Sequence, residues 1–147
     1  MITEILKEKT SADHLLYVSM KYTKTCDVIL NLLARWKSMM DISFDALIQK
    51  AFDNGQIKQM PESPKQKIEF LKLYFKKQKA VQEAIPLYIF FKRIPDTKKT
   101  REGEFRKNVN LKIIELNGTT DINMDKLKEY ADILERFISE TKQFLSV

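Results

Sequence analysis

The longest periodic segment of the chain runs from Leu15 to Ala51 and reads LLYVSMKYTKTCDVILNLLARWKSMMDISFDALIQKA. Its apolar residues recur at steps of three and four, the spacing that places side chains on one face of an α-helix. The stripe consists of Leu15, Val18, Tyr22, Cys26, Ile29, Leu33, Trp36, Met40, Phe44, Leu47 and Ala51. The pattern predicts a long helix with one buried face.

The ends of this helix are marked by residues that commonly cap helices. Either Thr10, with Asp13 three residues later, or Ser11 is expected to begin it, and Asn54-Gly55 to end it. A continuous helix of roughly 40 residues would be about 60 Å long, more than a small domain spans. We therefore expect either a break near Asp41-Ile42-Ser43 or a second copy of the chain that covers the exposed length.

Three further segments carry helical signals. The run Ser63-Pro64-Lys65-Gln66 combines a capping residue, a proline suited to the first helical position and a capping-box glutamine, and predicts a helix to about Lys77. The segment 80–94 predicts a helix kinked at Pro86, although its residues 87–91 also fit a buried strand. Residues 124–145 repeat their apolar positions every seven residues and predict an amphipathic C-terminal helix.

A change of period predicts a β-hairpin near 108–122. Val109, Leu111 and Ile113 alternate with polar residues, and Asn117-Gly118 is a strong signal for a hairpin turn. The length of 147 residues suits a single domain. We therefore predict a mainly α fold over residues 1–147: an antiparallel helical bundle with a long first helix, this small hairpin and the C-terminal helix.

Composition argues against several classes of protein. One cysteine excludes a disulfide scaffold, and one histidine argues against a His-rich metal site. The three glycines are isolated, so no phosphate-binding loop or dinucleotide fingerprint can be assembled. The longest apolar run, Ile85 to Phe91, is too short to cross a bilayer, and no signal-peptide pattern opens the chain. We expect a cytoplasmic protein that needs no metal and no organic cofactor.

Few residues are candidates for catalysis. His14 has no nucleophile near it in the sequence and is interpreted as a boundary residue of the first helix. Cys26 lies on the apolar stripe and is interpreted as a small buried hydrophobe. Asp41 and Asp45 are one helical turn apart, a spacing that fits either paired carboxylates in acid–base or metal chemistry or a solvated helix face.

The charge of the chain is concentrated in its middle third. Residues 1–57 carry seven basic and seven acidic side chains, residues 58–113 fifteen and six, and residues 114–147 four and seven. This imbalance predicts a basic surface on residues 58–113 that binds nucleic acid or an acidic partner protein. Its candidate contact residues are Lys76, Lys77, Lys79, Lys92, Arg93, Lys98, Lys99, Arg101, Arg106 and Lys107, which flank the aromatic residues Tyr88, Phe90 and Phe91.

The C-terminal helix also suggests self-association. Its apolar face is wide enough to require other helices for burial. We predict a homodimer with two-fold symmetry, the most common arrangement of identical chains. The residues expected at the interface are Leu127, Tyr130, Leu134, Phe137 and Ile138.

A family resemblance rests on two segments. The opening Ser11-Ala12-Asp13-His14-Leu15-Leu16 of a long amphipathic helix resembles the HEPN superfamily of small α-helical proteins. The segment from Thr100 to Val109 looks like the place where that family carries an Arg, four to six residues and then a His. The resemblance implies a four-to-five-helix bundle, usually homodimeric, that pairs with a nucleotidyltransferase or acts as a metal-independent ribonuclease. Here no His follows Arg101 or Arg106.

Two hypotheses about function follow. The first is a non-catalytic, homodimeric interaction module whose basic surface binds nucleic acid or an acidic partner. The second is a HEPN-type metal-independent ribonuclease or toxin–antitoxin component, in which Arg101 or Arg106 would bind phosphate beside an unidentified base. The missing Arg-to-His pair favours the first hypothesis.

Overall fold

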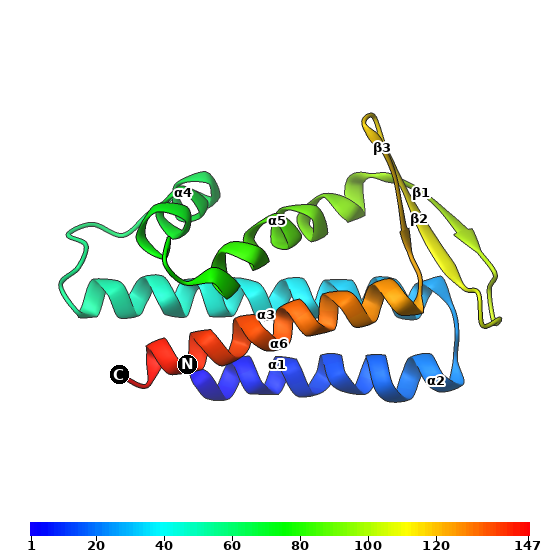
Figure 1. The fold of residues 1–147 in the computed structure, drawn as a ribbon, viewed down its shortest axis with the longest axis horizontal. Coiled ribbons are helices and arrows are strands. Elements are labelled where there is room, and N and C mark those ends of the chain that lie inside the picture. Colours follow the sequence, from blue (N-terminus) through cyan, green and yellow to red (C-terminus); the bar gives the residue numbers. More distant parts are fainter.

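The structure is a computed structural model that describes all 147 residues. Its elements, in chain order (Figure 1), are α1 (Ile2–His14), the π-helical turn η1 (Leu15–Ser19), α2 (Met20–Tyr22), α3 (Cys26–Asp53), α4 (Pro64–Tyr74), α5 (Lys79–Arg93), the 3-10 turn η2 (Ile94–Asp96), β1 (Lys98–Glu102), β2 (Asn110–Glu115), β3 (Gly118–Ile122) and α6 (Met124–Leu145). The predicted mainly α fold with a small antiparallel β element and a C-terminal helix is confirmed. None of the helices combines the length and the apolar composition that a bilayer crossing requires.

Helix α3 is the centre of the bundle. It runs antiparallel to α1 and contacts α5 and α6 on its other sides, while the sheet projects at the end where α3 begins (Figure 1). Trp36 of α3 stacks on Phe91 of α5 with ring centroids 6.1 Å apart. Phe44, further along α3, meets Phe137 of α6 edge-on at 5.2 Å. The buried stripe predicted from Cys26 onward is confirmed.

The break in the first helical stretch lies at residues 23–25 instead of near Asp41. Thr25 is extended and acts as the N-cap of α3, because its side chain accepts a hydrogen bond from the N–H of Val28. Thr10 and Ser11 lie inside α1, which already begins at Ile2. The chain therefore forms two antiparallel helices in this region instead of one long helix. No second copy of the chain is needed to cover an overlong helix.

The two helices after α3 begin in different ways. Ser63 and Gln66 form the predicted capping box at the start of α4, with both of its hydrogen bonds present. Residues 79–93 are helical with Pro86 inside, so helix is the correct alternative for this segment. The side-chain amide of Gln82 donates to the carbonyls of Leu71 and Phe75 at the end of α4, which ties the two helices together.

The sheet has one strand more than the predicted hairpin. Strands β2 and β3 form that hairpin, and β1 pairs antiparallel with β2 at the edge of the sheet. The alternating residues Val109, Leu111 and Ile113 are fully buried beneath the sheet. By contrast, β1 is polar and mostly exposed, so its sequence carries no alternation that would predict a strand.

The proposed dimer face of α6 is part of the core of the chain. Leu127, Tyr130, Leu134, Phe137 and Ile138 are between 0% and 8% exposed. Tyr130 packs edge-on against Phe91 of α5 at 5.4 Å. The assignment of these five residues to a dimer interface is therefore wrong, because α3 and α5 of the same chain already cover this face.

Truncation of this face should destabilise a single chain. We expect Phe137→Ala to lower the free energy of unfolding by about 3–5 kcal/mol, as in other cores that lose a buried aromatic ring. Leu116→Ala, at a fully exposed turn position, is the control and should change it by less than about 0.5 kcal/mol. Urea denaturation followed through the fluorescence of buried Trp36 measures both, and a loss below about 1 kcal/mol for Phe137→Ala would contradict the core assignment.

Alkaline pH should destabilise the protein through Tyr130. Burial and the nearby Glu129 raise the pKa of Tyr130 from 10.0 to about 12. The folded state therefore keeps the phenol proton where the unfolded state has lost it, so this contribution is intact below pH 10 and declines as the pH rises towards 12. Tyr130→Phe should show a shallower decline over this range in the same denaturation assay, and an unchanged slope would contradict the assignment.

Candidate nucleic-acid interface

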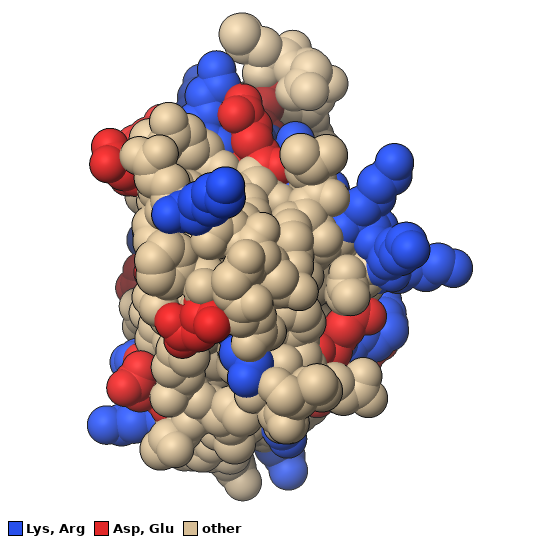
Figure 2. All heavy atoms as spheres, turned by 90° about the vertical axis from the view of Figure 1, so that its left-hand side faces the viewer, with Lys and Arg blue, Asp and Glu red and all other residues tan.

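The structure divides the ten predicted cations into two groups at opposite ends of α5. Lys76, Lys77 and Lys79 lie in the turn between α4 and α5, whereas the other seven lie between residues 92 and 107 (Figure 1). Because α5 has 15 residues and is therefore about 22 Å long, the ten cations do not form one patch. Figure 2 faces the end of the bundle that carries the chain termini, where cations are interspersed with acidic and uncharged residues and gather mainly at one margin.

Residues 92–107, here termed the basic edge, comprise the end of α5, η2, the edge strand β1 and the start of the β1–β2 loop. They contain seven Lys and Arg side chains against three Asp and Glu. Their positions along the exposed edge of the sheet make them the more extended of the two cationic groups.

Three cations of the basic edge stabilise the fold. Arg93 donates two hydrogen bonds to the carboxylate of Glu115, at 2.9 and 3.3 Å. The ammonium of Lys99 donates to three backbone carbonyls of the turn that contains η2. Arg101 forms an ion pair of 2.7 Å with Asp27 at the start of α3.

The other four cations of the basic edge are Lys92, Lys98, Arg106 and Lys107. Their side chains are exposed and take part in no hydrogen bond or ion pair within the chain. They are therefore available to bind an external anion without the loss of an internal contact.

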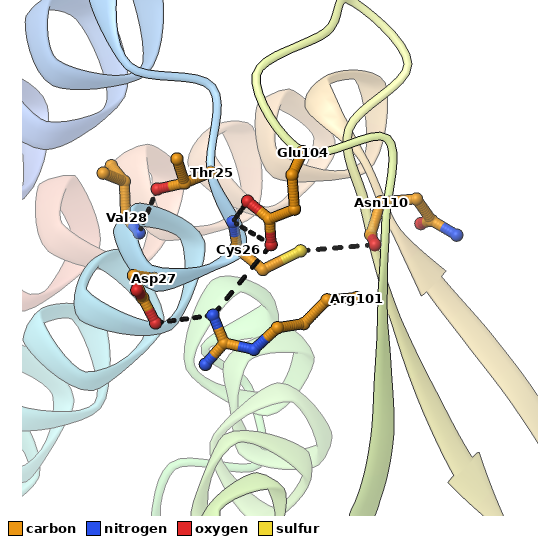
Figure 3. A network of polar contacts seen from close by, with 7 residues as sticks. All are labelled: Thr25, Cys26, Asp27, Val28, Arg101, Glu104 and Asn110. Carbon is orange, nitrogen blue, oxygen red and sulfur yellow. Dashed lines mark hydrogen bonds and ion pairs between the residues drawn. The ribbon is translucent and has the colours of Figure 1, made fainter.

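The β1–β2 loop is clamped onto the first turn of α3 (Figure 3). Both carboxylate oxygens of Glu104 accept from the N–H of Cys26, at 3.2 and 3.3 Å. A carboxylate at this position also interacts favourably with the helix dipole. The thiol of Cys26 donates to the carbonyl of Asn110 at 3.3 Å, so the loop is held at both of its ends.

Two residues of the loop have left-handed backbone conformations. Gly103 has φ +63°, and a Cβ there would lie 2.7 Å from the carbonyl oxygen of Asn108, so a larger residue does not fit. Phe105 has φ 65° although it is not glycine, and its N–H donates to the carbonyl of Lys24. Such a conformation costs an aromatic residue of order 1 kcal/mol or more, and the ring of Phe105 is nonetheless 75% exposed.

The hydrogen bond between Phe105 and Lys24 brings a second exposed aromatic residue to the same end. Tyr22, two residues before Lys24, is 77% exposed, and the ammonium of Lys21 lies 5.7 Å from the centre of its ring. We refer to Tyr22 and Phe105, with Lys21, Lys24, Arg106 and Lys107, as the aromatic end. In Figure 1 it lies where α2 and the β1–β2 loop approach each other, at the end of the bundle opposite the chain termini.

The sequence pattern missed this grouping. It assigned Val18 and Tyr22 to the buried stripe, but both are exposed, because the π-helical turn η1, which contains Val18 and precedes Tyr22, shifts the helical period. It placed possible stacking residues at Tyr88, Phe90 and Phe91, of which Phe91 is in the core. The local signal was a phenylalanine beside two cations in Glu104-Phe105-Arg106-Lys107.

Asp41 and Asp45 line a separate cleft of about 420 Å³ between α3, α4 and α5. Asp41 accepts from the hydroxyl of Tyr88 at 2.5 Å and pairs with Lys37 at 2.8 Å, and Asp45 pairs with Lys67 at 2.9 Å. Burial and the hydrogen bond to Asp41 raise the pKa of Tyr88 well above its ordinary value, so its phenol stays neutral. Both carboxylates thus have cationic partners from the chain.

The remaining candidates show no catalytic grouping. His14 is exposed at the end of α1 and has no hydrogen bond or ion pair with Arg101 or Arg106. No group of three or more His, Cys, Asp and Glu side chains is arranged to hold a metal ion. Within the basic edge and the aromatic end, the exposed cations without a hydrogen bond or ion pair in the chain are Lys92, Lys98, Arg106, Lys107 and Lys21.

The clamp at Glu104 should control both stability and the reactivity of Cys26. We expect Glu104→Ala to lower the free energy of unfolding by about 1–2 kcal/mol, because the first turn of α3 loses a charged acceptor. It should also accelerate labelling of Cys26 by a thiol reagent, since burial and Glu104 raise the pKa of that thiol to about 11 and only the thiolate reacts. Asp96→Ala, which removes an exposed carboxylate without an ion pair, is the control and should change neither quantity. An unchanged labelling rate in Glu104→Ala would show that this contact does not hold the loop.

Comparison of the chain with models of protein families, with curated proteins and with solved structures found no match. The function is therefore argued from the geometry of the basic edge and the aromatic end.

Proposed function

We propose that the protein is a non-catalytic module that binds nucleic acid through its basic edge. The observation that carries the proposal is the set of four exposed, unpaired cations, which lie at the end of α5 (Lys92), on the edge strand β1 (Lys98) and in the β1–β2 loop (Arg106 and Lys107). Exposed cations neutralise phosphates and release the counterions condensed on the polymer, which is the main source of sequence-independent affinity. Lys21 extends this surface at the aromatic end, where Lys24 is half-buried and donates to the carbonyl of Lys21.

The rigidity of the surface supports the proposal. Arg93, Lys99 and Arg101 fasten the basic edge to the sheet, to η2 and to α3 through internal contacts. Their neighbours are therefore presented on a fixed backbone, which lowers the conformational entropy lost on binding. The fixed cations Arg93, Lys99 and Arg101 lie between free cations on both sides in the sequence, so the paired side chains hold the backbone that carries the unpaired ones.

The arrangement favours binding over ribonuclease activity. A HEPN-type ribonuclease would use Arg101 or Arg106 beside a general base. The guanidinium of Arg101 is instead engaged by Asp27, and Glu104 lies 3.9 Å from it. The only histidine of the chain, His14, forms no hydrogen bond or ion pair with either arginine.

The proposal does not depend on a second copy of the chain. The homodimer stays a prediction, and a dimer would have to use a surface other than the buried face of α6. Light scattering that gives twice the chain mass of 17.3 kDa would support it. The cytoplasm is the compartment we propose, since it offers nucleic acid together with the reducing conditions that suit the free thiol of Cys26.

Charge reversal on the basic edge should abolish binding without unfolding the protein. We expect Lys98→Glu, Arg106→Glu and Lys107→Glu together to reduce the affinity for a fluorescent oligonucleotide at least tenfold. Wild-type affinity should fall on the order of 50-fold between 50 and 200 mM salt if about four phosphates of a single strand are contacted. Lys99 and Arg101 are left unchanged, because their reversal would also break the internal contacts described above.

The matched control is the reversal of Lys76, Lys77 and Lys79, which are also exposed and unpaired but lie at the other end of α5. It changes the net charge by the same amount and should alter the affinity by less than about threefold. Equal losses in both triple variants would show that only net charge matters. Binding of an acidic peptide but of no oligonucleotide would assign the surface to an acidic protein instead.

A further inference from the structure

We infer that the ligand is single-stranded and that Phe105 and Tyr22 stack on its bases, an inference that rests on the proposed function and specifies its ligand. The two rings come from segments more than 80 residues apart in the chain and are 75% and 77% exposed. The hydrogen bond from the N–H of Phe105 to the carbonyl of Lys24 holds their segments together. Leu73, Leu116 and Val147 are more exposed, but Phe105 and Tyr22 have the two most exposed aromatic rings of the chain, and their segments lie at the same end.

The backbone of Phe105 indicates that the exposed ring is held in place. A phenylalanine at φ 65° has a strained backbone. Because its ring lies mostly in water, burial of apolar surface does little to offset this strain. The fold keeps Phe105 there through the clamp of Glu104 on Cys26 and the hydrogen bond to Lys24. Strain of this kind concentrates at sites of ligand contact, where a fixed side chain reduces the entropic cost of binding.

The charges around the rings fit a strand whose phosphates flank a stacked base. Arg106 and Lys107 follow Phe105 directly in the loop, and Lys21 lies beside the ring of Tyr22. Two carboxylates of this region have partners within the chain: Glu104 accepts from the N–H of Cys26 and lies 3.9 Å from Arg101, and Asp27 pairs with Arg101. An alternation of cations and aromatic rings is the arrangement with which proteins bind single strands without reading their sequence.

A duplex does not offer the same contact. Its bases are stacked on both faces and paired at their edges, so a ring on a rigid loop finds no exposed base surface. Its phosphates would still attract the basic edge. The inference therefore predicts a preference for single strands that disappears when the rings are removed, while the weaker binding of duplex is retained.

The test compares a fluorescent single-stranded 12-mer with a hairpin duplex by anisotropy at constant salt. Phe105→Ala and Tyr22→Ala should each weaken binding of the single strand about 5- to 100-fold and change the affinity for the duplex by less than about twofold. Leu116→Ala, which removes an equally exposed apolar side chain from the turn between β2 and β3, is the control and should bind as the wild type does.

Two further variants separate stacking from stability. Phe105→Gly removes the ring and the strain together, so it should raise the denaturation midpoint while it weakens binding of the single strand. Phe105→Trp should retain binding. The oligonucleotide should quench the fluorescence of its exposed indole, while the fluorescence of buried Trp36 stays constant.

The outcomes distinguish this inference from the proposed function. If both alanine variants bind the single strand as the wild type does, while the triple reversal of Lys98, Arg106 and Lys107 does not bind it, the stacking inference is refuted. The proposal that the basic edge binds nucleic acid would then still hold. Equal affinity of the wild type for single strand and duplex would also overturn the stacking inference. Binding of neither oligonucleotide would refute the proposed function, and binding of anionic lipid vesicles in their place would identify the aromatic end as a membrane-surface contact.

Discussion

The N–H of Cys26 donates to both carboxylate oxygens of Glu104, which lies 78 residues further along the chain. This contact satisfies a donor that the first turn of α3 would otherwise leave unpaired, and it places a negative charge at the positive end of the helix dipole. It also fixes the β1–β2 loop against the helical bundle. Local turns also shape the loop, since the N–H groups of Arg106 and Val109 donate to the carbonyls of Gly103 and Arg106, but its placement against the start of α3 depends on the contact between Glu104 and Cys26.

The basic edge shows how one run of like charges can serve two purposes. Arg93 and Arg101 form ion pairs with Glu115 and Asp27, and the ammonium of Lys99 donates to backbone carbonyls, so all three have partners within the fold. The remaining cations have no internal partner and stay in water, where charged groups need no compensation. The amino-acid composition does not distinguish these seven side chains. Only the unpaired ones, however, can bind a ligand without breaking an internal contact.

The aromatic end departs from the rules that the rest of the molecule follows. Most of the other large aromatic rings pack edge-on or stacked in the core, as Trp36 does with Phe91, whereas Tyr17 and Phe52 are also exposed. At this end a phenylalanine is both strained and exposed, beside an exposed tyrosine. In a fold whose local preferences otherwise agree with its global structure, such departures are expected where a ligand binds. They are the structural basis of the proposal that single strands are the ligand.

Local signals in the sequence determined the elements whose stabilising contacts are close in the chain. The capping box of α4, the Asn117-Gly118 hairpin and the seven-residue repeat of α6 were all predicted correctly, because hydrogen bonds and periodicity over a few residues decide them. Tertiary structure decided the rest. Strand β1 forms because it pairs with β2. The apolar face of α6 packs against its own chain instead of a second copy. Phe105 is held in an exposed position because its loop is anchored to the start of α3. The free energy of these features comes from partners in other elements of the fold, such as β2 for β1 and the start of α3 for the β1–β2 loop, which no local pattern of residues specifies.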